Sequence, residues 1–209
     1  AEKRRPYKIC DDEELERLCK SPRHQGVVAM VREPEIPPMT AEDLEAWAAS
    51  GTTGLLLDSV GNDNNLGAIV RSAAFFGIDT VVLSSEDKEA RLTTSAYRVA
   101  AGGMEHVKFR SVKDPAAFLK DAGKRLTVLG ADHRARMRLR DLGAVLAERR
   151  EGPAGKRGVM LVLGNEETGL SAQVKERCSV LVRIPGTGNV ESLNVAQAAT
   201  LFLHELFEL

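Results

Sequence analysis

Three short segments of this sequence carry the polar side chains that could do chemistry, and each follows an apolar run. Each segment contains a glycine, an asparagine and one further polar residue. These residues are Asn65, Gly67 and Arg71 in the first segment, Gly164, Asn165 and Glu166 in the second, and Gly188, Ser192 and Asn194 in the third. Amides and hydroxyls orient a ligand through hydrogen bonds, and a guanidinium binds anions. In open α/β sheets, ligands bind outside the carboxyl ends of the strands. The residue types therefore indicate one ligand site built from these segments.

Each segment also has a purely structural explanation. Asn65 could cap a helix, with Arg71 a solvated side chain, and Glu166 could lie in a solvated turn. Ser192 suffices as the N-cap of the last helix. Asn194 is harder to explain in this way, because Asn is a mediocre helix former inside a first turn.

The glycine pattern argues against two common phosphate sites. No Gly-Lys-Ser/Thr follows Gly164, so the segment is no Walker A loop. The G-x-G-x-x-G fingerprint and a downstream ribose-binding acid are missing too. A nicotinamide-dependent oxidoreductase on a Rossmann sheet is therefore the weakest of the alternatives.

Length and composition limit the class of protein. The chain has 209 residues, which suits one domain with a small addition or two small domains. Lys plus Arg number 29 against 30 Asp plus Glu, so a strongly basic, histone-like binder is excluded. Aromatic residues make up only 4%, which counts against a stacking platform for single-stranded nucleic acid.

Cysteine and histidine usage predicts no metal site. The three cysteines form no C-x-x-C pair and the four histidines show no ligand spacing. Isolated cysteines suit a reducing compartment. No apolar run approaches the ~18 residues of a membrane span. The basic start has no apolar stretch behind it, so no signal peptide is predicted. We expect a cytoplasmic protein without membrane or metal.

The first fifty residues differ from the rest. Strands are expected at 7–10 and 26–31, and a helix capped by Asp11 or Asp12 runs through Leu18. The prolines between Glu33 and Pro38 predict a stiff linker, and a short helix is expected at 43–49. Because so few elements cannot bury a core alone, we interpret residues 1–35 as the tail of a domain or as an appendage.

From residue 54 the pattern alternates between apolar runs and helices. Strands are expected at 55–57, 80–83, 107–109, 126–129, 159–163 and 180–184, and helices at 66–76, 94–101, 115–122, 139–149 and 192–207, with a loop at 151–156. Continuous apolar strands between helices predict an α/β fold with a mostly parallel sheet covered on both faces.

The ordered set of segments resembles the three motifs of the SpoU family, RNA ribose 2′-O-methyltransferases of the SPOUT superfamily. The matching residues are Asn65-Leu66-Gly67 with Arg71, then Gly164-Asn165-Glu166 with Gly169-Leu170-Ser171, then Ile184-Pro185 with Gly188 and Ser192-Leu193-Asn194-Val195. His24 to Ala29 also resembles the end of an L30e-like RNA-binding domain. Residues 1–35 would then be its remnant, 36–52 a linker with a short helix, and 53–209 the methyltransferase domain.

The resemblance implies a fold, a reaction and roles for particular residues. It implies a C-terminal deep trefoil knot that binds S-adenosylmethionine, in a homodimer with composite sites, and methyl transfer to a ribose 2′-hydroxyl in tRNA or rRNA. The catalytic set would be Asn65, Arg71, Glu166, Ser192 and Asn194. The cofactor would contact Leu163, Gly164, Asn165, Ile184, Gly188 and Leu193. Where many members have Asp-Pro, this chain has Asn-Asp-Asn before Asn65, which predicts a looser turn.

Two questions stay open at this stage. Arginine keeps its proton, so Arg71 suits binding of a phosphate and a developing alkoxide better than a base. Residues 108–150 hold 12 Lys or Arg against 5 Asp or Glu, and we expect the dense stretch to bind RNA through Arg134, Arg136, Arg138 and Arg140. A solvated charged face is the plainer explanation of such a run. A catalytically idle RNA-binding protein on the same fold is the alternative function.

Overall fold

The computed structural model describes the whole chain except residues 1–5, 85–91, 152–154 and 156–157. It divides into two compact units, Ala1–Pro34 and Glu35–Leu209. We describe each unit by itself. Most of the loop expected at 151–156 lies outside the described residues.

The described residues of the first unit contain one helix. Helix α1 (Asp12–Cys19) is capped by Asp11, whose side chain accepts from the backbone N–H of Glu14 at 2.9 Å, as the sequence predicts. The strands expected at 7–10 and 26–31 were wrong, because these residues form no strand. A strand needs neighbours for its backbone groups, and no other described segment of this unit supplies one.

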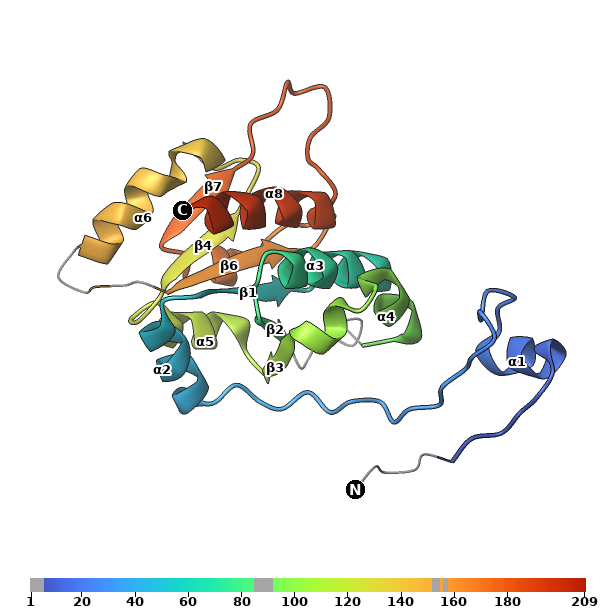
Figure 1. The fold of residues 1–209 in the computed structure, drawn as a ribbon. Helices are drawn as coiled ribbons and strands as arrows, with labels where there is room; N and C mark the ends of the chain where they lie inside the picture. Colours follow the sequence, from blue (N-terminus) through green and yellow to red (C-terminus); the bar gives the residue numbers. More distant parts are fainter. Residues whose placement is uncertain (1–5, 85–91, 152–154, 156–157) are drawn as a thin grey trace. The chain divides into compact units, whose positions relative to one another are not determined.

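The second unit is built on one seven-stranded sheet in which every strand pairing is parallel (Figure 1). The strands are β1 (Thr53–Asp58), β2 (Thr80–Ser84), β3 (Lys108–Val112), β4 (Thr127–Ala131), β5 (Met137–Arg138), β6 (Val159–Gly164) and β7 (Val180–Arg183). Strands β1 and β6 are buried almost throughout, which is why they read as continuous apolar runs. The α/β fold expected from the sequence is confirmed.

Helices cover both faces of this sheet. They are α2 (Ala41–Ser50), α3 (Asp63–Phe75), α4 (Thr94–Ala100), α5 (Pro115–Ala122), α6 (Leu142–Glu151), α7 (Ala172–Lys175) and α8 (Val195–Glu208). One apolar core lies under α3, α4, α6 and α8, and a second under α2, α5 and α7. Figure 1 shows α8 lying alongside α3. The expected helix 139–149 is a 3-10 turn, Leu139–Asp141, followed by α6.

The strand order is β3-β2-β1-β6-β4-β7-β5. The late strand β6 therefore lies in the centre, between β1 and β4, and β7 lies between β4 and β5. Because all the strands run in one direction, the loops that follow β1, β6, β4 and β7 leave from the same edge of the sheet. The expected motifs lie on three of these four loops.

The proline-rich segment packs on the far edge of the sheet. Pro38 forms a parallel bridge with Ser111 of β3, and the backbone N–H of Met39 donates to the Ser111 carbonyl at 2.8 Å. Proline suits an edge, where a missing N–H costs no ladder bond. Beyond it, Asp43 of α2 pairs with Arg110 of β3 through two bonds of 3.0 and 3.1 Å.

Candidate functional site

Helix α3 positions the first segment one turn further into the helix than expected. The cap is Asn62, whose Oδ1 accepts from the backbone N–H groups of Asn64 at 2.8 Å and Asn65 at 3.4 Å. The expectation that Asn65 caps the helix was therefore wrong. Because Asn62 satisfies the first N–H groups, the Asn65 side chain is free to make other bonds. Gly67 serves packing, because a Cβ there would lie 2.5 Å from the Ala96 carbonyl oxygen of α4.

The second segment is a tight turn closed by its own residues. Asn165 and Gly169 exchange backbone bonds of 3.1 and 2.9 Å, with Gly169 at φ +70°. The Asn165 side chain accepts from the backbone N–H groups of Glu167 and Thr168. A Cβ on Gly164 would lie 2.3 Å from the Gly169 carbonyl carbon, so glycine is required there by the protein's own backbone. Asn165 and Gly164 therefore shape this turn.

The third segment ends in the cap of α8. Asn194 is the N-cap, and its Oδ1 accepts from the backbone N–H of Ala196 at 2.9 Å and of Gln197 at 3.4 Å. The expectation that Ser192 caps this helix was wrong, because the helix starts at Val195. Ser192 is exposed and bonds to no other described residue. The cap explains Asn194 structurally, but its amide nitrogen is still available.

Three side chains from the three segments form one hydrogen-bonded chain, which we call the polar triad: Asn65, Glu166 and Asn194. Asn65 Nδ2 donates to Glu166 Oε1 at 2.5 Å, and Asn65 Oδ1 accepts from Asn194 Nδ2 at 2.9 Å. These bonds assign the orientation of both amides, since each nitrogen donates and each oxygen accepts. Segments far apart in the sequence are thus joined at the carboxyl edge of the sheet.

Arg71 lies on the exposed side of α3, outside the polar triad. It forms no hydrogen bond or ion pair with another residue of the described part of the chain. Long helical side chains lean toward the helix N-terminus, which here is the end that carries Asn65. Its guanidinium is therefore available to a ligand at that edge.

The residues expected to contact the cofactor divide into two groups. Leu163 is buried in β6 beside Gly164. Ile184, Gly188 and Leu193 lie on the long loop between β7 and α8, and Leu193 keeps 43% of its surface exposed. Within the described part of the chain, backbone groups of residues 186–192 make no hydrogen bond to other backbone groups. This loop thus offers free donors and acceptors beside aliphatic side chains.

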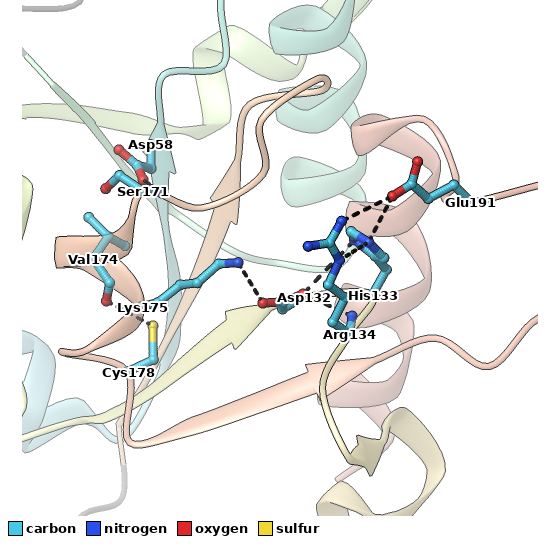
Figure 2. Close-up of polar contacts among 9 residues, drawn as sticks. All are labelled: Asp58, Asp132, His133, Arg134, Ser171, Val174, Lys175, Cys178 and Glu191. Carbon is cyan, nitrogen blue, oxygen red and sulfur yellow. Dashed lines mark hydrogen bonds and ion pairs between the residues drawn. The ribbon is translucent and has the colours of Figure 1, made fainter.

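Two acidic residues that the sequence analysis missed support the loops. Asp58, 6% exposed at the end of β1, accepts from the backbone N–H of Ser171 at 2.9 Å. Figure 2 shows Lys175 of α7 reaching Asp132, at the end of β4, with 2.8 Å between Nζ and Oδ2. Burial alone raises the pKa of Asp132, but the Lys175 ammonium and the Arg134 N–H lower it further than burial raises it. A lone acid directly after an apolar strand was the signal available in the sequence.

The four arginines expected to bind RNA are all exposed. Arg134 and His133 both contact Glu191 on the β7–α8 loop, at 3.4 and 3.3 Å (Figure 2). Arg140 pairs with Asp141 at 3.7 Å, while Arg136 and Arg138 pair with no described residue. The segment 134–140 therefore lies beside the β7–α8 loop.

Within the described ranges, no three His, Cys, Asp or Glu side chains lie close enough together to hold a metal ion. Among the same residues, no helix is long and apolar enough to cross a membrane. The polar triad, a guanidinium without a partner among the described residues and an open backbone loop are suited to binding and orienting ligands.

Comparison with known families and proteins gives one consistent result. Residues 53–204 match the SpoU rRNA Methylase family, and residues 1–37 match a family described as RNA 2′-O ribose methyltransferase substrate binding. The chain is 38% identical over 197 residues to the 23S rRNA (guanosine-2′-O-)-methyltransferase RlmB of Acinetobacter baylyi. That alignment covers 91% of this chain and 73% of the relative.

Two solved structures with bound cofactor share the fold. The SpoU methyltransferase AviRb of Streptomyces viridochromogenes in complex with the cofactor AdoMet aligns with a TM-score of 0.59 and 25% identity, over 74% of this chain and 56% of that one. The AdoMet-bound rRNA methyltransferase of Sinorhizobium meliloti aligns with a TM-score of 0.61 and 25% identity, over 76% and 56%. The chain thus spans less than two thirds of these solved chains.

Proposed function

The chain belongs to the SpoU rRNA Methylase family, and from that premise we propose that it transfers a methyl group from S-adenosylmethionine to a ribose 2′-hydroxyl of RNA. The proposed substrate is a guanosine of 23S rRNA, the substrate named for the Acinetobacter relative, and a tRNA nucleoside is the alternative. The observation that carries the proposal is the polar triad, because it joins all three motif segments at one edge.

The residues present suit this cofactor. The β7–α8 loop combines backbone groups that bond to no other described backbone group with the aliphatic side chains of Ile184 and Leu193, which fits a flat purine with polar edges. Apart from Gly188 itself and its two chain neighbours, no described residue has an atom within 4 Å of the position that a Cβ of Gly188 would take, so a ligand has room there. Leu163 and Gly164 would form the floor, with Asn165 shaping the turn. The cofactor supplies a methyl group that its sulfonium already activates for displacement.

The protein's part in the step is positioning and electrostatics. The 2′-oxygen forms a bond to the methyl carbon as the carbon–sulfur bond breaks, and the hydroxyl proton leaves to solvent or to a neighbouring phosphate. Holding both reactants in line lowers the activation barrier by about 7–11 kcal/mol. Arg71 binds the adjacent phosphate and the developing alkoxide, since a guanidinium keeps its proton. The polar triad, with Ser192 beside it, orients the ribose.

A homodimer is part of the proposal, and its support is an apolar face on α3 and α8. Phe75 is 81% exposed, Phe207 62% and Leu201 43%, and Phe76 contacts both phenylalanines, with ring centroids 5.0 and 5.8 Å away. Patches of this kind mark association sites. Arg71 lies one turn before Phe75 on the exposed side of α3, so a second copy on this face would border the site.

Three further elements of the proposal rest on the family match. Residues 1–35 are the end of an L30e-like RNA-binding domain, supported by the substrate-binding match over 1–37. The C-terminal part forms a deep trefoil knot, supported by the late strands β6 and β7 lying between earlier ones. RNA as substrate and the free thiols of Cys10, Cys19 and Cys178 favour the cytoplasm.

Isothermal titration with S-adenosylmethionine and with its demethylated product tests the proposal. We expect micromolar binding with about one site per chain, and transfer of a labelled methyl group to unmodified 23S rRNA transcripts. Binding of RNA without binding of either cofactor form would instead support the idle RNA-binding alternative. Light scattering of the double variant Phe75→Glu with Phe207→Glu should show a monomer, and the same variant should transfer no methyl group.

A further inference from the structure

Arg183, the last residue of β7, has an unsatisfied side chain. Its Nε is buried and has no hydrogen-bond partner, and the guanidinium pairs with no other residue in the described part of the chain. Arg183 as a whole is half-buried, and a buried N–H group in a folded protein nearly always has a partner. An exception of this kind calls for a ligand that is bound only when the protein works.

A second arginine lies beside it. The pairing of β5 with β7 places Arg138 opposite Arg183, and Met137 opposite Val182. Val182 packs in the core under α3 and α8, so alternation along the strand directs Arg183 to the other face, the face of α7. Paired residues of neighbouring strands share a face, so Arg138 and Arg183 present two guanidinium groups side by side.

The carboxylate on this face is already engaged. Asp132 follows Ala131, which pairs with Val182, so Asp132 and Arg183 lie on the same side of neighbouring strands. Its carboxylate bonds to Lys175 Nζ at 2.8 Å (Figure 2). Among the described residues, no ion pair joins it to Arg183 or Arg138. Two cations without a counter-ion repel each other, and an anion between them would relieve that repulsion.

We propose that Arg183 and Arg138 together bind one phosphate of the substrate RNA. The inference rests on the proposed function and adds a residue outside the three motifs. Guanidinium pairs suit phosphate because their planar N–H groups match its oxygens. Ile184, the next residue, begins the loop proposed to hold the cofactor, so the bound phosphate would lie close to the reacting ribose. The cofactor's carboxylate has the same anionic chemistry, and the experiment separates the two.

The test measures RNA affinity against salt concentration. Wild type and the double variant Arg138→Gln with Arg183→Gln are titrated onto labelled, unmodified 23S rRNA transcript between about 50 and about 200 mM KCl. We expect about tenfold weaker binding at low salt, and a plot of log Kd against log salt that is shallower by about 0.7 to 0.9 for one lost phosphate contact. Affinity for S-adenosylmethionine should not change. The matched control is Arg125→Gln. Arg125 precedes the amino end of β4 and pairs with Glu45, so this change should leave both affinities unchanged.

Each other outcome overturns the inference in a distinguishable way. An unchanged salt slope with weaker cofactor binding would assign the pair to the cofactor's carboxylate. If the double variant bound RNA and S-adenosylmethionine as tightly as an active wild type, the phosphate site at Arg138 and Arg183 would be refuted and the proposed function would stand. A wild type that neither binds RNA nor transfers methyl groups would refute the proposed function together with the pair.

A stability measurement excludes a merely structural role. Arg183→Met removes a buried N–H without a partner and keeps the apolar stem, so the melting temperature should stay equal or rise while RNA affinity falls. A lower melting temperature with unchanged RNA affinity would show that Arg183 serves the fold only.

Discussion

Asn65 and Glu166 are 101 residues apart in the chain, and the Asn65 amide donates to the Glu166 carboxylate at 2.5 Å. The other end of the same amide accepts from Asn194. Asn65 therefore joins the turn after β6 to the cap of α8, and its two ends require one donor and one acceptor. An amide is the side-chain group of this size that supplies both.

Replacing Asn65 by Asp should abolish most of the activity without unfolding the protein. The new carboxylate can still accept from Asn194, but it cannot donate to Glu166 and adds a like charge beside it, so the bond between α3 and the turn after β6 is lost. Loss of one preorganised group lowers kcat by about 10²–10³. Methyl transfer to rRNA transcripts measures this, with Asn64→Asp, an exposed neighbour at the same helix start, as control. Equal losses in both variants would contradict the role of the triad.

Arg71 should act as a fixed positive charge. Arg71→Ala is expected to lower kcat by about 10²–10³, and Arg71→Lys by less, because the charge remains. For Arg71→Lys, the profile of rate against pH should be as flat as that of wild type below pH ~9, since lysine stays protonated there. A rate that rises with pH and follows the pKa of the new lysine would instead indicate a base at this position.

Gly164 and Gly186 form a matched pair for the turn after β6. A Cβ on Gly164 would lie 2.3 Å from the Gly169 carbonyl carbon and 2.4 Å from the Leu170 nitrogen, so Gly164→Ala must displace backbone. We expect a loss of about 2–4 kcal/mol in the free energy of unfolding in urea. A Cβ added to Gly186 would have no described atom within 4 Å other than those of Gly186 and its two chain neighbours. Gly186→Ala should therefore change the free energy of unfolding by less than ~0.5 kcal/mol. Similar stabilities for both variants would refute the close approach.

The Asp43–Arg110 pair should make stability depend on pH in the acid range. The hydrogen-bonded Arg110 guanidinium, against some burial, lowers the pKa of Asp43 to about 2. A carboxyl whose pKa is lower in the folded state stabilises the protein above its unfolded pKa of about 3.9, and this stabilisation is lost as pH falls toward about 2. Asp43→Asn should therefore cost about 1–2 kcal/mol at pH 7 and almost nothing near pH 2.

Thermal melts of both proteins across this range measure the effect. Asp121→Asn is the control, because Asp121 pairs with Lys124 on the surface, where such pairs contribute little. A difference between wild type and Asp43→Asn that does not shrink below pH ~4 would show that the capping bonds between Asp43 and Thr40 at the start of α2, not the charge of Asp43, carry the stabilisation.

The sequence predicted the elements best where local chemistry decides them. Strands β1 and β6 are continuous apolar runs because both of their faces are buried, and Asp11 marks the start of α1 because its side chain satisfies a local N–H. The strands expected at 7–10 and 26–31 failed because a strand depends on partners that the local sequence does not contain. The caps Asn62 and Asn194 were misplaced by a few residues, since several polar residues in a row can each serve as a cap.

By itself the sequence determined the α/β class, the polar residues of three loops and the likeness to the SpoU family. Tertiary structure alone decided that β6 lies between β1 and β4, and hence that Glu166 meets Asn65 and Asn194. It also decided that Asp132 pairs with Lys175, and that the buried Nε of Arg183 has no hydrogen-bond partner among the described residues. The physical reason is that periodicity and caps are short-range, whereas strand order and ion pairing depend on the packing of distant segments.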